Sequence, residues 1–490
     1  MAVIDLPKIL IASAICVVLP AMGSRKPRNK VKENVLLLDM AAEGKCVARI
    51  DDKVYFVEGG VPGDLVDILV EKDKKSFAEA RVYRLKEASK DREPAFCPHF
   101  GVCGGCKWQN LNYTKQLELK TKQVKDAFQR IGKIIDGQWF PILPSTKTTY
   151  YRNKLEFTFS DQRWLNEGDM NPQEKLNLNG LGFHIPKRFD KILDISKCYL
   201  QPDPSNAIRL WVKAYAEQNG LTFFNLKIQT GLLRNLMVRT TSAGELMVLL
   251  IVAEDKPKEM NGLLTSLHQA FPEINSLLYL LNQKKNDSYS DLKARTFAGN
   301  PYVIEEMENL KFRVGPTSFY QTNADQALVL YRLVAKLAKV QPTDHVYDLY
   351  SGTGTISQFL ARYAASVVGV EYVEAAVHDA NENAKLNQLT NTRFFAGDMA
   401  KVLNNRFVQE NGKPDVLITD PPRAGMHPDV VASILEMQPE RIVYVSCNPA
   451  TQARDLALMT EDYLVKEIHP VDMFPHTHHV ENVVLMERRK

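Results

Sequence analysis

From Pro342 onward, short apolar runs alternate with turns and helix-like segments, a pattern that few folds can accommodate. Strand, turn and helix repeated in this order predict a doubly wound α/β domain, because parallel strands need a helical crossover between them. The five apolar runs are HVYDLY (345–350), SVVGVE (366–371), TRFFAGD (392–398), VLITD (416–420) and RIVYVSC (441–447).

Each of these runs carries, at or near its end, a residue that can do chemistry. In an open α/β sheet, ligands bind outside the carboxyl ends of the strands. A single aspartate at such a place is as often a helix cap, but five reactive residues at one edge predict a site. A cysteine at an exposed strand end can act as a thiolate nucleophile, whereas a core cysteine is inert. The five residues are Asp348, Glu371, Asp398, Asp420 and Cys447.

The turn after the first run reads DLYSGTGT, residues 348–355. Gly352 and Gly354 would let the backbone approach a ligand closely, and Glu371 follows Gly352 by 19 residues, where an acid bonds ribose hydroxyls in nucleoside-binding folds. The turn lacks the third glycine of a dinucleotide fingerprint and any Gly-Lys-Ser/Thr. The pattern therefore favours an adenosine cofactor without a pyrophosphate, S-adenosylmethionine (SAM).

The remainder of the 490-residue chain predicts further domains. Residues 32–86 alternate β-like runs with Gly turns, which predicts a small OB-like barrel. Residues 150–313 mix strands with a helix or two, an α+β pattern. We expect four regions: an N-terminal arm (1–31), the barrel (32–86), a central α+β domain (87–313) and the doubly wound domain (314–490).

Charge and hydropathy say less about the function and location of the protein. The formal net charge of +4 does not by itself indicate a nucleic-acid partner, although six Lys/Arg against Asp5 and Glu33 make residues 1–35 locally basic. The apolar run from Ile9 to Met22 is short for a membrane span and follows a poor signal n-region. We expect a cytoplasmic enzyme without membrane association, with translation starting near Met22.

Of the seven cysteines, Cys97, Cys103 and Cys106 form a C-x5-C-x2-C pattern, and Cys198 is a distant fourth candidate. Disulfides are rare in the cytosol. Four thiolates in one place bind zinc or an iron–sulfur cluster. Only one C-x2-C pair is present, which slightly favours a cluster and leaves zinc as the alternative.

Seven segments together resemble one family, the SAM-dependent RNA (uracil-5-)-methyltransferases, and within it the RumA-like 23S rRNA enzymes. The resemblance covers nearly the whole chain after about residue 31. It rests on CPHFGVCGGCKWQ (97–109), YYRNKLEFTF (150–159), SFYQTN (318–323), DLYSGTGT (348–355), DPPRAG (420–425), VSCNP (445–449) and FPHTHHVENVVL (474–485).

The resemblance implies a mechanism and a cofactor site. Cys447 would add to C6 of a uridine and Glu481 would remove the proton from C5. Phe319 or Tyr320 would stack on the flipped base. Thr355 and Asp398 stand where the best-known members have Asn. The implied SAM-binding residues are Gln321, Tyr350, Thr355, Glu371, Asp398 and Asp420.

The resemblance also implies a [4Fe–4S] cluster, an RNA-binding TRAM domain over residues 32–86 and a monomeric enzyme acting on 23S rRNA. The expected fold is an OB-like TRAM barrel, a central α+β domain with the cluster and a Rossmann-like methyltransferase domain. The implied cluster ligands are Cys97, Cys103, Cys106 and Cys198.

Several other functions compete with this one. The same chemistry on tRNA is the nearest alternative, and a non-catalytic iron–sulfur RNA-binding protein is another. A radical-SAM TRAM protein would need C-x3-C-x2-C. An amine methyltransferase would carry an aromatic residue where Arg423 follows Asp420-Pro-Pro, and it would not need Cys447. Adjacent histidines on a strand point in opposite directions, so His476, His478 and His479 are interpreted as structural or RNA-facing.

Overall fold

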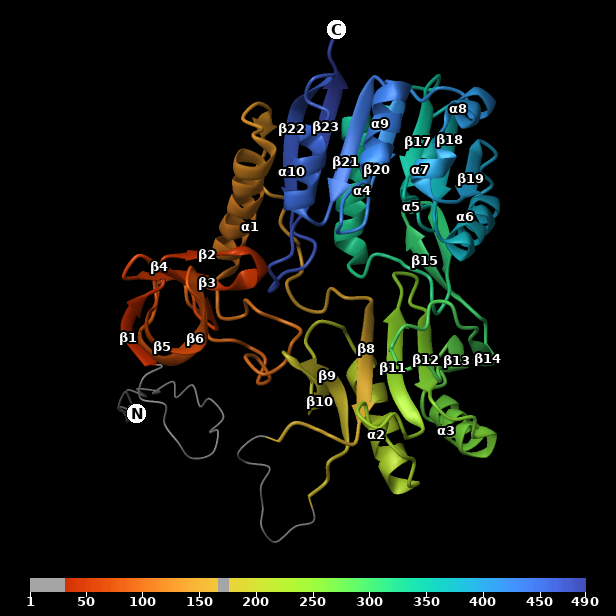
Figure 1. The fold of residues 1–490 in the computed structure, drawn as a ribbon. Helices are drawn as coiled ribbons and strands as arrows, with labels where there is room; N and C mark the ends of the chain where they lie inside the picture. Colours follow the sequence, from red (N-terminus) through yellow and green to blue (C-terminus); the bar gives the residue numbers. More distant parts are fainter. Residues whose placement is uncertain (1–30, 166–175) are drawn as a thin grey trace, which may run out of the picture. The chain divides into compact units, whose positions relative to one another are not determined.

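The computed structural model describes residues 31–165 and 176–490 (Figure 1). The basic arm and the start at Met22 that the sequence predicts lie outside the described residues. The described chain forms two compact units, one ending at Arg92 and one beginning at Glu93. No described helix is long and apolar enough to span a bilayer.

The first unit is a six-stranded sheet whose strands curl around one apolar core (Figure 1). Alternate residues of each strand point inward, as the period of a strand requires, so that Cys46 and Ala48 are fully buried. The sheet order is β1-β5-β6-β4-β3-β2. The strands are β1 (Val31–Leu36), β2 (Asp39–Met40), β3 (Cys46–Ile50), β4 (Lys53–Glu58), β5 (Leu65–Asp73) and β6 (Phe77–Glu87), with a 3₁₀ turn at Ala42–Gly44.

The second unit begins with a seven-stranded sheet in the order β10-β9-β8-β11-β12-β13-β14. Helices α2 (Ser205–Gln218) and α3 (Pro257–Ala270) bury one face. The other face joins the core of the C-terminal domain through β11 and β12. The strands are β8 (Lys154–Ser160), β9 (Gly180–Ile185), β10 (Arg188–Asp194), β11 (Leu233–Thr240), β12 (Leu246–Val252), β13 (Ser276–Leu281) and β14 (Arg295–Gly299), and the hairpin of β15 (Val303–Met307) and β16 (Leu310–Val314) follows.

The C-terminal sheet has eight strands in the order β19-β18-β17-β20-β21-β23-β22-β7. The five strands from β19 to β21 are parallel, and β23 runs antiparallel to both β21 and β22. The doubly wound α/β domain is therefore confirmed. The strands are β17 (His345–Leu349), β18 (Ser366–Glu371), β19 (Thr392–Ala396), β20 (Val416–Thr419), β21 (Arg441–Ser446), β22 (Tyr463–Val471) and β23 (Glu481–Arg488).

Helices cover both faces of this sheet, because each parallel strand is buried on both sides. Val346 of β17 packs with α4 (Ala324–Ala338) and α5 (Thr355–Ala361), whereas its neighbour Tyr347 packs into the opposite core. The opposite core takes in α9 (Pro428–Met437) and α10 (Pro449–Ala457). The other helices are α6 (Glu374–Leu386), α7 (Met399–Val402) and α8 (Asn405–Asn411).

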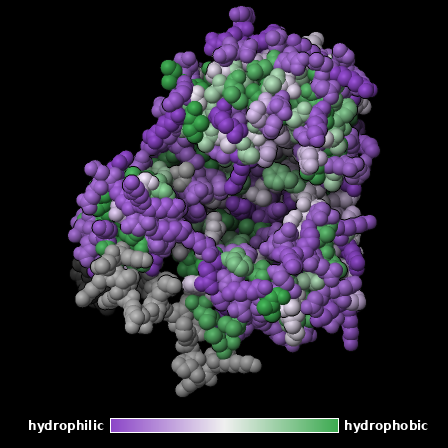
Figure 2. Space-filling view, viewed as in Figure 1, coloured by the Kyte–Doolittle hydropathy of each residue, from purple (hydrophilic) through white to green (hydrophobic). Residues whose placement is uncertain are grey.

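A segment from early in the chain completes this domain. Helix α1 (Tyr113–Ala127), continued by a π-helical turn (Phe128–Gly132), buries Val124 and Phe128 in the core beside α10. Strand β7 (Gln138–Trp139) then pairs with β22 at the sheet edge. Figure 1 shows α1 lying alongside α10 and β22, far from its sequence neighbours in the central sheet. The visible surface is mostly hydrophilic, with scattered apolar patches (Figure 2).

Candidate active site

The candidate site lies where the strand order reverses. From β17 the chain continues to β18 and β19 on one side, whereas β20 and β21 lie on the other. In open α/β sheets the ligand crevice forms outside the carboxyl ends of the strands at such a switch point. The ends of β17, β18, β20 and β21 carry the polar residues that the sequence singled out.

The two glycines of the turn after β17 have different roles. Both have positive φ, 54° at Gly352 and 76° at Gly354, which disfavours any other residue. A Cβ added at Gly352 would meet no atom within 4 Å, whereas one at Gly354 would lie 2.8 Å from Phe394 Cζ. Gly352 therefore opens toward the ligand crevice, and Gly354 allows close packing against Phe394. Glu371 Oε2 accepts a 3.0 Å hydrogen bond from Gly352 N, and Oε1 accepts one of 2.8 Å from Val373 N.

Two buried aspartates at the carboxyl ends of the strands have raised pKa values. Burial raises the pKa of Asp348 to about 7, against hydrogen bonds from Ser357, whose hydroxyl donates at 2.5 Å. Burial and the charge of Asp348 raise the pKa of Asp420 to about 7. Asp348 Oδ1 and Ser351 Oγ are buried without a hydrogen-bond partner. Open backbone at Gly352, an oriented acid at Glu371 and free buried polar atoms fit a polar adenosine ligand.

The other residues predicted to bind the cofactor lie along the same carboxyl ends of the strands. Tyr350 has φ 63°, and burial, Asp455, Asp398 and Glu371 raise its pKa to about 12. Thr355 Oγ1 lies 3.1 Å from Tyr331 OH, and Asp398 caps α7 by accepting from Ala400 N. Gln321 lies before α4, where its carbonyl accepts from Asn153 Nδ2 at 3.1 Å.

The register of β21 against β23 brings Cys447 and Glu481 together. The antiparallel pairs run from Arg441–Glu487 to Ser446–Asn482. Cys447 directly follows the last residue of β21 in this ladder, and Glu481 directly precedes Asn482. Cys447 is half-buried, and Glu481 is buried. The thiol and the carboxyl therefore both lie next to the last pair of the ladder, where burial and then the Glu481 carboxylate raise the pKa of the Cys447 thiol.

The electrostatics of this pair are dominated by desolvation and like charge. Burial, Asp420 and Glu481 raise the pKa of the Cys447 thiol to about 11, and the Arg423 guanidinium lowers it. Burial and Asp420 raise the pKa of Glu481 to about 8, again against Arg423. Arg423 is the nearby cation that favours the charged forms of both groups. The sequence flagged Arg423 only as a missing aromatic residue, and its electrostatic role follows from the fold.

Hydrogen bonds fix the loop that follows Cys447. Asn448 caps α10 by accepting from Ala450 N, and its Nδ2 donates at 2.9 Å to the carbonyl of Arg423. Thr451 Oγ1 donates to the same carbonyl at 3.2 Å. Asn448 and Pro449 begin a helix and join the nucleophile candidate to the Asp420–Gly425 turn.

All four predicted cluster cysteines line one pocket in the second unit. Burial raises the pKa of Cys103 to about 12 and that of Cys106 to about 11, and the neighbouring thiols contribute in the same direction. Arg152 and Lys197 also line the pocket. In the described part of the chain, no group of three or more His, Cys, Asp or Glu is arranged around a single metal ion. The pocket nevertheless gathers the four cysteines that the sequence grouped.

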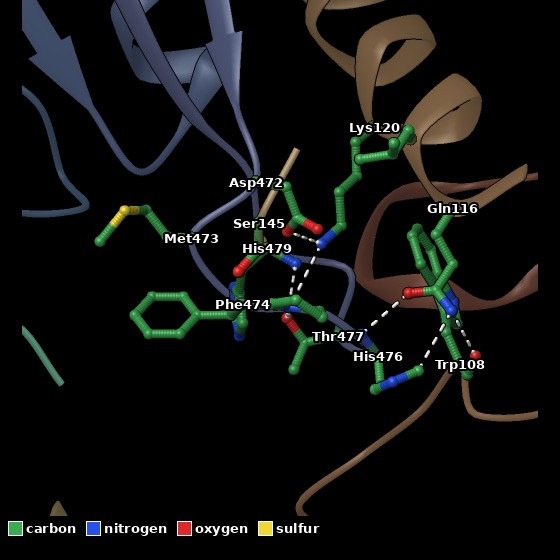
Figure 3. Close-up of polar contacts among 12 residues, drawn as sticks. Trp108, Gln116, Lys120, Ser145, Asp472, Met473, Phe474, His476, Thr477 and His479 are labelled. Carbon is green, nitrogen blue, oxygen red and sulfur yellow. Dashed lines mark hydrogen bonds and ion pairs between the residues drawn. The ribbon is translucent and has the colours of Figure 1, made fainter. Parts of the chain in front are cut away.

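The sequence indicated a structural or RNA-facing role for His476 on the loop between β22 and β23, residues 472–480, but it did not connect this loop with helix α1. Asp472, His476 and Thr477 on this loop make buried hydrogen bonds, several of them to helix α1 (Figure 3). The contact with α1 had one signal in the sequence: Tyr113, Gln116 and Lys120 are polar residues on one face of this helix. A polar helix face usually faces solvent, so the pattern did not predict a buried contact. Of the two base-stacking candidates, Tyr320 is in the core at 3% exposure and Phe319 is exposed at 70%.

The comparisons with known proteins agree with this geometry. A family model described as tRNA (Uracil-5-)-methyltransferase matches residues 293–489, and one described as TRAM domain matches residues 31–83. A protein of Bacteroides thetaiotaomicron named as an uncharacterized RNA methyltransferase is 53% identical over 454 residues, 92% of this chain and 100% of the relative. One from Chlorobaculum tepidum, named in the same way, is 39% identical and covers 92% of this chain and 95% of its own.

One solved structure is similar over almost the whole chain. The Pyrococcus abyssi tRNA (uracil-54, C5)-methyltransferase, in complex with S-adenosyl-L-homocysteine, has a TM-score of 0.72 and 28% identity. The matched region covers 92% of this chain and 99% of the Pyrococcus abyssi chain. The fold and site define a TRAM-containing methyltransferase of the doubly wound class. The chain belongs to the SAM-dependent RNA (uracil-5-)-methyltransferase family, as the motifs predicted.

The two turn glycines predict separable defects. Gly352→Ala places a methyl group in open space but on a backbone with positive φ, so we expect weaker binding of S-adenosylhomocysteine with only a small fall in melting temperature. Gly354→Ala drives a methyl group into Phe394 and should lower the melting temperature by several degrees, because overpacking typically costs about 1–3 kcal/mol. Calorimetric titration and thermal unfolding measure the two effects. Equal loss of stability in both variants would contradict the assignment.

Proposed function

We propose that the protein transfers a methyl group from SAM to C5 of a uridine in 23S rRNA, through a covalent bond between Cys447 and C6 of the base. The observation that supports the proposal is the pairing of β21 with β23, whose last pair, Ser446–Asn482, is adjacent in sequence to both Cys447 and Glu481. Cys447 and Glu481 lie at the sheet edge that also carries the glycine turn and Asp420. A nucleophile and a base beside an adenosine site suit covalent catalysis.

The reaction balances with these groups. Uracil C5 is a poor nucleophile, and addition of the Cys447 thiolate to C6 moves the C5–C6 electron pair toward C5. When bound, SAM supplies an electrophilic methyl group and keeps the sulfur–carbon electron pair as the new C5–methyl bond forms. Glu481 then takes the proton from C5. The C5–C6 double bond re-forms, the S–C6 bond breaks and Cys447 regains its electron pair.

The proposed roles of the remaining site residues follow from their chemistry. Glu371 suits the ribose hydroxyls, and Gly352 allows close approach of the adenosine. Gln321, Tyr350, Thr355, Asp398 and Asp420 complete the proposed cofactor site. Phe319, exposed at 70%, is the proposed stacking residue for the flipped base.

The choice of RNA is the finer part of the proposal. The TRAM domain and the four cysteines favour 23S rRNA, because tRNA enzymes of the resembled family generally lack both features. The Pyrococcus abyssi tRNA enzyme, however, is similar to 92% of this chain, which weakens the argument for 23S rRNA. A tRNA uridine is therefore the second candidate. We further propose that the enzyme acts as a monomer in the cytoplasm.

We propose that Cys97, Cys103, Cys106 and Cys198 hold a [4Fe–4S] cluster. Four cysteines, one of them buried and three partly buried, share a pocket with Arg152 and Lys197, which supports this. A zinc ion held by the same four sulfurs is the alternative. The methyl transfer needs no electron transfer, so the proposed role of the cluster is structural or in positioning RNA.

Covalent trapping tests the reaction and identifies the RNA. The full-length protein is mixed with SAM and either a 23S rRNA fragment or tRNA, each containing 5-fluorouridine. Fluorine cannot leave C5 as a proton does, so we expect a stable protein–RNA adduct by mass spectrometry with the 23S fragment.

Cys447→Ala should abolish this adduct, and Cys46→Ala, which changes a fully buried cysteine of the first unit, should leave it intact. An adduct only with tRNA would select the second candidate. Methylation of ordinary RNA without any adduct would refute the covalent route.

The pH dependence of kcat tests the electrostatics of the pair. Glu481 must be ionised to accept a proton, and its pKa is about 8. We therefore expect kcat to rise as the pH is raised through 8. Arg423→Gln removes the cation that lowers the pKa of both Cys447 and Glu481, so the rise should move to higher pH. Arg406→Gln, at an exposed position on α8, is the matched control. An unshifted profile in Arg423→Gln would contradict the assignment.

Metal content tests the cysteine site independently of activity. Anaerobically purified protein should be brown and contain about four iron atoms per chain. Cys198→Ala should lose most of this iron, whereas Cys46→Ala should retain it. Colourless protein with one zinc per chain would show that the site holds zinc instead.

A further inference from the structure

Glu481 begins β23, and the loop before it is held by groups from two earlier segments of the chain. Val471, the last residue of β22, pairs with Glu481. The residues between them, 472–480, form the connecting loop, which we call the base loop. Any displacement of the base loop would move the first residue of β23, because the strand starts where the loop ends.

Helix α1 contributes three side chains to this loop. Tyr113, Gln116 and Lys120 are spaced by three and four residues, which places them on one helix face. Lys120 is fully buried and lies 2.5 Å from Asp472 Oδ1, while its ammonium group also donates to the carbonyl of Phe474 at 3.0 Å. Tyr113 OH donates to Asp472 Oδ2 at 2.8 Å. Figure 3 shows Lys120 reaching from the helix to the start of the base loop.

Gln116 bonds the middle of the same loop. Its Oε1 accepts from His476 N at 2.8 Å, and its Nε2 lies 3.2 Å from His476 Nδ1 (Figure 3). The same Nε2 donates to the carbonyls of Trp108 and Leu111. Gln116 is fully buried. One amide therefore joins the base loop to the segment that precedes α1.

The cysteine-bearing segment adds two further bonds. The backbone N–H groups of Lys107 and Trp108, directly after Cys106, both donate at 3.0 Å to the carbonyl of His476. The ring of Phe96, directly before Cys97, lies edge-on to the His476 ring at 5.1 Å. His476 itself has φ 63°, a left-handed conformation that is unfavourable for a residue with a side chain. These bonds hold the strained residue in place.

From these contacts we infer that Gln116 and Lys120 are positioning residues for Glu481, fixing the base loop so that its carboxylate reaches the proton on C5. The inference rests on the proposed function, in which Glu481 is the base. Neither residue touches the reacting atoms. Both act at the last step, where C5 loses its proton and the S–C6 bond breaks.

The inference predicts a specific kinetic signature. If Glu481 is misplaced, thiol addition and methyl transfer still occur, but release from the methylated adduct slows. Lys120→Met and Gln116→Leu should each lower kcat by about 10- to 100-fold, as expected for a catalytic group displaced by about 1 Å. Both should accumulate a covalent complex with ordinary uridine RNA, while the trapping rate with 5-fluorouridine RNA stays within about twofold of the unchanged protein.

Two further variants, and the comparison of Gln116→Leu with Lys120→Met, make the test decisive. Lys122→Met makes the same chemical change on the same helix, but Lys122 pairs with Asp126 at the surface, so it should behave like the unchanged protein. Gln116→Leu repeats the test without leaving Asp472 as an unpaired buried charge. Glu481→Gln should accumulate the adduct most strongly.

Loss of kcat in step with loss of 5-fluorouridine trapping, or no adduct on ordinary RNA, would reduce Gln116 and Lys120 to a structural role and overturn the inference. A Glu481→Gln enzyme that releases product at the normal rate would refute Glu481 as the base. It would also refute the positioning role of Gln116 and Lys120, which depends on that base. Adduct accumulation in Glu481→Gln alone would leave the proposed function intact and refute only the positioning role.

Discussion

The antiparallel pairing of β21 with β23 is the constraint on which the candidate chemistry depends. Side chains along a strand alternate between faces, so a slip of one residue would turn Glu481 to the other face of the sheet. The register is held along six residue pairs by buried apolar side chains such as Val443, Val483 and Leu485. Core packing in one part of the sheet therefore fixes the geometry of a reactive pair at its end.

The carboxyl ends of the strands bring several acids together, and the Arg423 guanidinium lowers the pKa of two groups among them, Cys447 and Glu481. Asp348, Asp420 and Glu481 all have raised pKa values, and each carboxylate makes ionisation of the next one harder. The free enzyme therefore keeps much of this edge protonated near neutral pH. A positively charged methyl donor such as SAM would favour the charged carboxylates, so cofactor binding and ionisation should support each other.

The sequence predicted the elements whose signals are local. The apolar runs gave the parallel strands, and the residue at the end of each run lies at the sheet edge in the structure. The positions of Lys120 and Asp472, 352 residues apart, could not be predicted, because a buried ion pair leaves no local pattern. The different roles of Gly352 and Gly354 were equally hidden, since both glycines fit the same turn and only Phe394 distinguishes them.

The buried ion pair also explains why the C-terminal domain depends on an earlier part of the chain. Removing one partner of a buried pair typically costs roughly 3–5 kcal/mol, and α1 further buries Val124 and Phe128 against the methyltransferase core. A fragment beginning at residue 314 would lack α1 and β7, expose this apolar face and leave Asp472 without Lys120. The segment that carries three of the cysteines continues directly into α1, and α1 holds the base loop. A change at the cysteine site that displaces α1 would therefore also displace the base loop.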